Sequence, residues 1–110
     1  MFRRTTALVA LLALSSGCAM AYKSFYKDTS RENDPAPVRP GQVDVVKSRD
    51  NLTSQWTEIG LYRGKAPTVK EAMATAKQEC GRHGANLYIL NVEPFHSGGG
   101  WNIDGICARK

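Results

Sequence analysis

Four stretches of the second half of the chain have the apolar pattern of β-strands. Residues 43–47 and 56–63 are β-branched or alternate apolar with polar side chains, as a half-buried strand does. Residues 87–92 are apolar at nearly every position, which is typical of a central strand covered on both sides. Residues 101–109 alternate again after a glycine-rich stretch. We therefore expect four strands in this half.

One helix is predicted between the second and third of these strands. Its apolar residues fall at offsets 0, 3, 4, 7 and 11, the stripe of an amphipathic helix: Val69, Ala72, Met73, Ala76 and Cys80. Thr68 and Glu71 have the spacing of a capping box at its start. His83 and Gly84 supply a basic last turn and a left-handed cap at its end.

This order of elements predicts an α+β fold for residues 43–110. The expected architecture is a two-layer sandwich, with one helix packed on a small, mainly antiparallel sheet in the order β-β-α-β-β. In the last strand Ile103, Gly105 and Cys107 share one face, and we expect that face to lie under the helix.

Residues 1–17 have the pattern of a lipoprotein signal peptide. Arg3 and Arg4 form a basic head, and residues 7–14 are an unbroken apolar run. Eight apolar residues are too few to span a membrane as a helix, which needs about 20. The sequence Leu14-Ser15-Ser16-Gly17-Cys18 resembles a bacterial lipobox, in which the Cys is acylated and becomes the first residue of the mature chain.

Two cleavage schemes remain open at this point. Besides acylation of Cys18, ordinary cleavage after Ala19-Met20-Ala21 fits the small-residue rule and would release a periplasmic or secreted protein. For the acylated form, Ala19 stands where an inner-membrane retention signal has Asp, so we expect a lipid anchor in the outer membrane, facing the periplasm.

Residues 18–42 are predicted to be the acylated Cys18 and a flexible, Pro-rich tether. Pro35, Pro37 and Pro40 lie among charged and small residues, without apolar periodicity. The aromatic residues near its start are Tyr22, Phe25 and Tyr26. They either belong to a plain linker or rest among lipid headgroups.

The charge of the chain disfavours nucleic acid as a partner. Loss of the signal peptide lowers the Lys plus Arg count from 15 to 13 against 10 Asp plus Glu, a net charge of +3. These cations are scattered singly between acids, as in Lys47-Ser48-Arg49-Asp50, rather than gathered on one face.

Cys80 and Cys107 are predicted to form a disulfide. Acylation or cleavage removes Cys18 from consideration, and an isolated pair in an oxidising compartment should be bridged. A zinc site built from these two Cys with His83 and His96 is the weaker alternative, because exported thiols oxidise. We therefore expect no metal and no cofactor.

Two further groups of residues are candidates for a catalytic site and for a partner-binding surface. Ser97 and His96 are neighbours in sequence and are poorly placed for nucleophilic catalysis, so we do not expect an enzyme. Trp56, Tyr62 and Trp101 are the candidate partner surface, as one exposed aromatic patch. The alternative is that they form a second small core on the sheet.

These motifs together resemble a known family. The lipobox, the Pro-rich tether, a Val-x-Val strand, Glu58-Ile59-Gly60, an Ala-rich helix, Gly84-Ala85-Asn86 and a last strand ending in Cys are similar to the Rcs stress-sensor outer-membrane lipoprotein (RcsF-like) family. The resemblance implies an outer-membrane-anchored, disulfide-stapled binding domain without catalysis.

Two functions follow as expectations. The first is a small domain that binds another envelope protein in a sensor, assembly or inhibitor role. The second is a structural or ligand-binding surface lipoprotein that takes glycan or a small cation.

Overall fold

A computed structural model describes residues 24–30, 33–52 and 55–110. The seven main elements, in chain order, are β1 (Phe25–Asp28), β2 (Asp44–Val46), β3 (Thr57–Ala66), α2 (Val69–Arg82), β4 (Leu87–Leu90), β5 (Phe95–Ser97) and β6 (Gly100–Arg109). Two short 3-10 turns, η1 (Pro40–Gln42) and η2 (Arg49–Asn51), flank β2. Among the described helices, none is long and apolar enough to cross a membrane.

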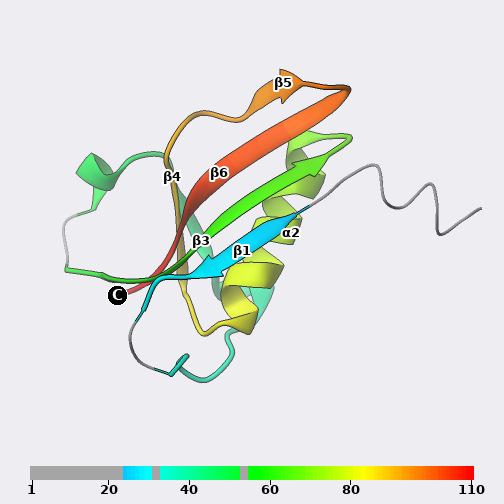
Figure 1. Ribbon diagram of the computed structural model, residues 1–110. Helices are drawn as coiled ribbons and strands as arrows, with labels where there is room; N and C mark the ends of the chain where they lie inside the picture. Colours follow the sequence, from blue (N-terminus) through cyan, green and yellow to red (C-terminus); the bar gives the residue numbers. More distant parts are fainter. Residues whose placement is uncertain (1–23, 31–32, 53–54) are drawn as a thin grey trace, which may run out of the picture.

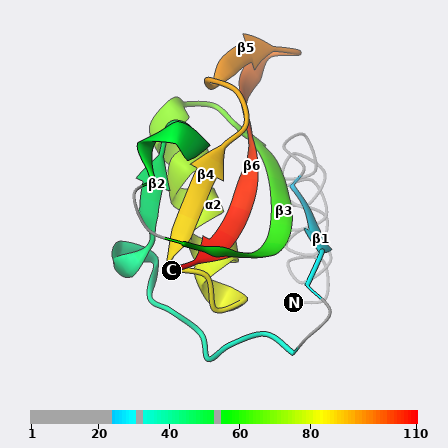
Figure 2. The ribbon, with the colours of Figure 1, turned by 90° about the vertical axis from the view of Figure 1, so that its left-hand side faces the viewer.

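The strands form a six-stranded mixed sheet in the order β1-β3-β6-β4-β2, with β5 paired to β6. Strands β2 and β4 run parallel, and the other pairs are antiparallel. Helix α2 covers one face of this sheet, while β1 and β2 lie at its two edges (Figures 1 and 2). For the described residues, the α+β class and the packing of one α-helix on a sheet are confirmed.

The predicted order β-β-α-β-β is wrong, because the structure contains β1 and β5 as well and the sheet is mixed. Neither strand has a local signal strong enough to be recognised, since each has at most four residues. Each becomes a strand through its partner: Tyr26 of β1 pairs with Tyr62 and His96 of β5 pairs with Trp101. Gly98 and Gly99 of the glycine-rich stretch form the tight hairpin turn between β5 and β6, and both have positive φ.

The boundary of the predicted tether is also wrong, because residues 24–30 and 33–42 pack on the domain. The β1 ladder joins four residues to β3. Farther on, Val38 N donates to Gly81 O at 2.8 Å, and Pro35 lies against Gly84 at the end of α2. A proline-rich composition predicts flexibility, but Pro35 and Val38 of this segment contact the end of the helix.

Helix α2 begins and ends as predicted. Thr68 Oγ1 accepts a hydrogen bond from Glu71 N at 3.2 Å, which caps the first turn. At the other end Gly84 adopts φ +85°, a left-handed conformation that favours glycine. Arg109 Nη1 donates to Gly84 O at 2.8 Å, so the last strand also holds this cap.

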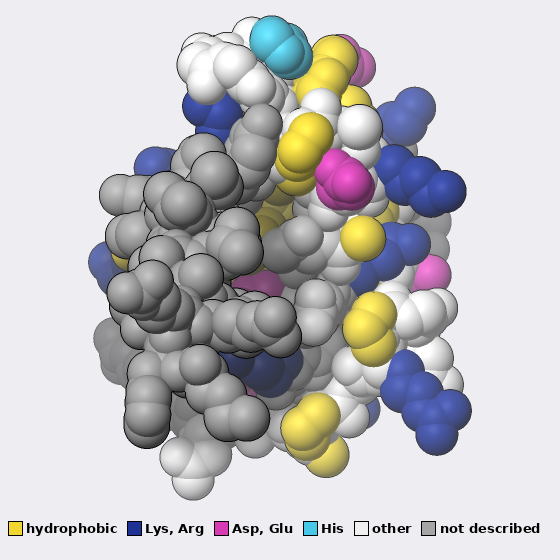
Figure 3. Space-filling view, turned by 90° about the vertical axis from the view of Figure 1, so that its right-hand side faces the viewer, with side chains coloured by type: hydrophobic (Ala, Val, Ile, Leu, Met, Phe, Trp, Pro, Cys, Tyr) yellow, Lys and Arg dark blue, Asp and Glu magenta, His cyan; other side chains and the backbone are white. Residues whose placement is uncertain are grey.

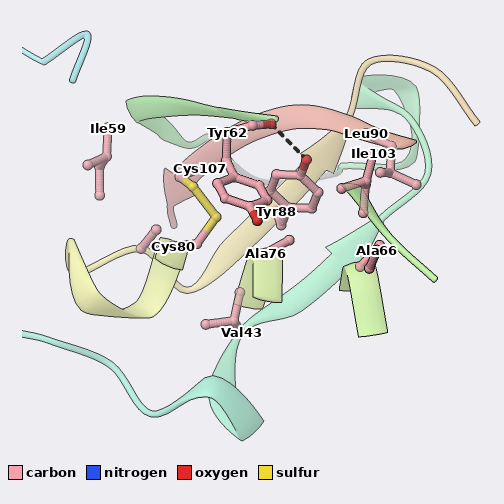
Figure 4. Packing of buried hydrophobic residues seen from close by; sticks show 12 residues of the cluster. Val43, Ile59, Tyr62, Ala66, Ala76, Cys80, Tyr88, Leu90, Ile103 and Cys107 are labelled. Carbon is pink, nitrogen blue, oxygen red and sulfur yellow. Dashed lines mark hydrogen bonds between the residues drawn. A yellow bond between two sulfur atoms is a disulfide. The ribbon is translucent and has the colours of Figure 1, made fainter. Parts of the chain in front are cut away.

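The main core lies between α2 and the sheet (Figure 4). Ala72, Ala76 and Cys80 of the helix are buried, and their small size lets the helix lie close to the strands. Tyr88 fills the space over Gly105, and its hydroxyl donates to Tyr62 O at 3.0 Å. The sheet thus buries two tyrosines where inward-facing glycines leave room.

The Cys80–Cys107 disulfide predicted from the sequence is confirmed. It joins α2 to β6 with Cα atoms 5.2 Å apart, and both side chains are fully buried (Figure 4). Ile103 and Cys107 both belong to the helix-side core, as their spacing predicted.

A second, smaller core covers part of the opposite face of the sheet. Its buried members are Leu87, Ile89, Ile106 and Ala108. Leu52 and Trp56, which precede β3 in the chain, pack against it from outside. Strand β4 is therefore covered on both faces, as its continuous apolar run predicted.

Candidate interaction surface

The three aromatic residues predicted to form one exposed patch lie in three different places. Tyr62 is only 1% exposed and points under α2, so its assignment to a surface is wrong. It faces inward because Gly60, Tyr62 and Gly64 alternate on the helix side of β3. Trp56 packs on the second core and lies under the Arg49 guanidinium at 5.8 Å, which agrees with the small-core alternative.

Trp101 is the one member of that trio that lines a surface groove. The groove runs between the first half of α2, the end of β2 and the β4–β5 connection. Its lining residues are Val45, Lys47, Val69, Met73, Leu90, Glu93, Pro94 and Trp101. The ring of Trp101 meets the ring of His96 edge to face at a centroid distance of 5.5 Å, so β5 braces one wall.

The groove has an apolar floor, with one cation and one carboxylate at its edge. Val45, Met73 and Trp101 are half-buried, which leaves part of each apolar side chain accessible from outside. Lys47 and Glu93 are exposed at its edge, and exposed Lys70 adjoins Met73 in a second depression that continues past the helix toward Pro40. Figure 3 shows basic side chains at both margins of this side of the molecule, and those at the right-hand margin lie next to a broken row of apolar ones.

A second cluster joins the segment before β2 to the end of α2. His83 Nδ1 lies 2.6 Å from Asp34 Oδ2, and His83 Nε2 lies 3.4 Å from Glu79 Oε1. The ring of Tyr26 stacks on the His83 ring, with centroids 3.7 Å apart and planes 5° from parallel. Burial raises the pKa of Tyr26, and the nearby Asp34 and Asp28 carboxylates raise it further, so the phenol stays protonated.

The contacts of this cluster join three segments of the chain, and they do not place a nucleophile beside the His83 ring. An Asp–His pair can orient a general base, but the second ring nitrogen of His83 faces the Glu79 carboxylate instead of a hydroxyl or thiol. What the contacts do is hold Asp34 and β1 against the helix end.

The residues of the alternative zinc site are not brought together. Cys80 and Cys107 are bonded to each other, His83 lies beside Asp34, and His96 lies against Trp101 in β5. Within the described part of the chain, no group of three or more His, Cys, Asp and Glu side chains is placed to hold a metal ion. Cys18 lies outside the described residues.

Comparison with known proteins identifies a shared fold. No protein-family model and no curated protein matches the chain. A solved structure, the crystal structure of a Francisella virulence factor, FvfA, in its orthorhombic form, is similar with a TM-score of 0.61. The two chains are 16% identical, and the similarity covers 80% of this chain and 97% of that one. At this identity the likeness shows the fold alone, and the RcsF-like resemblance stays a prediction.

Sequence reasoning missed the groove because its walls come from four distant segments. Val45, Val69, Leu90 and Trp101 each belong to a separate element, and only the sheet order brings them together. Trp101 is half-buried at the surface, and its neighbours in the groove depend on the parallel pairing of β2 with β4, which has no local sequence signal.

Proposed function

We propose that the protein is a lipid-anchored envelope protein whose small, disulfide-stapled domain binds another envelope protein without catalysing a reaction. The anchor is acylated Cys18, and the location is the periplasmic side of the outer membrane. The observation that carries the binding role is the apolar groove beside Trp101, with the basic side chains Lys70 and Lys77 in the depression that adjoins it.

The disulfide supports an exported location. Both sulfur atoms lie in the core between α2 and β6, where the bridge is part of the packing. Such structural disulfides persist in oxidising compartments and are rare where thiols are kept reduced. The signal-peptide pattern of residues 1–17 indicates the same destination.

The groove favours a protein segment with apolar and acidic side chains. Apolar anchors such as Trp and Met are enriched at the centres of protein interfaces, with charged groups at the rim. Lys47 and Glu93 of the groove itself carry opposite charges. Lys70 and Lys77 line the adjoining depression, so cations outnumber carboxylates over the two hollows together, which favours an acidic partner. No such complementarity is evident for a neutral glycan.

The anchor is tested on the protein isolated from cells. Mass spectrometry of the mature chain should find a lipid-modified Cys18 at its N-terminus, and Cys18→Ser should release the protein from the membrane fraction or block its processing. A mature chain that begins at Tyr22 without modification would overturn the lipid anchor.

The binding role is tested by photo-crosslinking in cells, with a crosslinking amino acid in place of Lys47 at the groove. We expect one adduct of discrete mass, identifiable as a single envelope protein by peptide sequencing. The control is the same amino acid in place of Thr75, which is exposed on the outward side of α2. Lys70→Glu should weaken the adduct, whereas Lys110→Glu, away from the groove, should not. Adducts of equal yield at positions 47 and 75 would contradict the proposal.

A further inference from the structure

The large exposed apolar side chains of the described residues gather at one end of the sheet. They are Phe25 (56% exposed), Val92 (48%) and Phe95 (48%). All three lie near the same level of the sheet. Phe25 in β1 pairs with Arg63 of β3, whose partner in β6 is Asp104. Val92 follows Asn91, whose N donates to Asp104 O, and Phe95 pairs with Asn102 of β6. The opposite end of the sheet carries no comparable exposed residue among those described.

Phe25 and Phe95 face the same shallow hollow, on the side of the sheet away from α2. Arg63, Lys65, Asn102 and Asp104 line it between them. Because alternate residues of a strand share a face, Lys27 lies on the same side as Phe25. Arg63 pairs with Asp104 at 3.1 Å but keeps a side chain 70% exposed. Lys27, Arg63 and Lys65 therefore outnumber Asp104 on this side of the sheet, and exposed Glu93 adds a second carboxylate next to Val92.

Cys18 is connected in sequence to this same end of the sheet, through the start of β1. Figure 1 shows the start of β1, the end of β3 and the β5–β6 hairpin at the same end of the sheet. Only residues 19–24 separate Cys18 from Phe25, a span of at most about 25 Å when fully extended. An acyl chain on Cys18 would therefore hold this end, and not the end with Thr57, close to the lipid.

We infer that the end of the sheet formed by Phe25, Val92 and Phe95, with the cations Lys27, Arg63 and Lys65, rests on the surface of an anionic phospholipid membrane. The inference rests on the proposed lipid anchor. Aromatic side chains are favoured at the level of the headgroups, and Lys and Arg are attracted to anionic lipids. Each contact is weak alone, but the short covalent connection gives it a high effective concentration.

The test uses the mature, lipidated protein reconstituted in vesicles containing phosphatidylglycerol. A fluorophore is attached at one of two positions. The first is Ser97→Cys, near Phe95 in β5; the second is Thr57→Cys, the first residue of β3, at the opposite end of the sheet. Because the native disulfide is fully buried, labelling needs no reductant and leaves it intact. A quencher carried on the lipid should cause loss of fluorescence at position 97 and none above background at position 57.

Three comparisons decide the outcome. Phe25→Ser with Phe95→Ser should abolish quenching at position 97 while the protein stays bound through its lipid, and Ala74→Ser, on the outward side of α2, should leave quenching unchanged. In vesicles of phosphatidylcholine alone, which carry no net negative charge, quenching at position 97 of the parent protein should be weaker. Equal quenching at both positions, or none at position 97, overturns the inference and assigns the apolar end to a protein partner. Failure of the anchor itself is seen separately, because an unmodified Cys18 would prevent reconstitution.

Discussion

Removal of the disulfide by the double variant Cys80→Ala, Cys107→Ala should destabilise the domain severely. The bridge closes a loop with a sequence separation of 27 residues. On the chain-entropy model, a loop of this length restricts the unfolded chain by about 3.6 kcal/mol of free energy. Total stabilities of small domains are about 5–15 kcal/mol, so the loss is a large fraction of the whole.

The second consequence is in the core. Both sulfur atoms are fully buried between α2 and β6, and two Ala side chains leave part of their volume empty. The double variant avoids a buried unpaired thiol, which would confuse the comparison. At about 4–8 °C per kcal/mol for a domain of this size, the melting temperature should fall by about 15–30 °C.

Thermal and urea unfolding followed by circular dichroism measure the effect. If the bridge acts on the unfolded state, the variant should also show a larger dependence of unfolding free energy on urea, because its unfolded chain exposes more surface. Thr75→Ala, at an exposed site of α2, is the control and should change stability by less than about 0.5 kcal/mol. A loss below about 1 kcal/mol in the double variant, with an intact bridge in the parent protein, would refute the reasoning.

Two further predictions concern the segment before β2. Gly84→Ala should destabilise the domain more than Gly99→Ala, by about 1–3 kcal/mol in unfolding free energy: both glycines have nearly the same positive φ, +85° and +82°, but a Cβ at position 84 would lie 2.5 Å from Pro35 O while position 99 is open. Equal losses in urea unfolding would mean that Pro35 does not pack on the helix end. In limited proteolysis, the resistant core should retain Phe25–Asp28, because this strand pairs with β3; intact-mass measurement of a core beginning near Val43 would instead restore the longer flexible tether.

The sequence predicted those parts of the fold whose signals are local. The helix has its cap at Thr68, its apolar stripe and its glycine end cap within seventeen residues, and the structure agrees at both ends. The disulfide also followed, because Cys80 lies on the helix stripe and Cys107 on the strand face beneath it.

The missed parts depend on distant partners. Strand β1 has only four residues, and its inward side chain, Tyr26, finds its place over Gly60 and against His83. Nothing near Tyr26 in sequence indicates those contacts. Tyr62 was misplaced for a related reason: alternation fixes that it faces one side of β3, but only the glycines at 60 and 64 and the position of α2 decide that this side is the core.

The contacts around α2 restrain its two ends unequally, and this bears on how the groove would work. The C-terminal end is held by the disulfide at Cys80, by the Val38–Gly81 hydrogen bond and by the His83 cluster. The N-terminal end, which lines the groove through Val69 and Met73, is held mainly by its Thr68 cap and by packing on β3 and β6. A partner bound beside Trp101 would therefore contact the less restrained end of the helix, while the other end is held in place. Any adjustment on binding should consequently be confined to the first turns of α2 and the β4–β5 connection, leaving the disulfide and β1 in place.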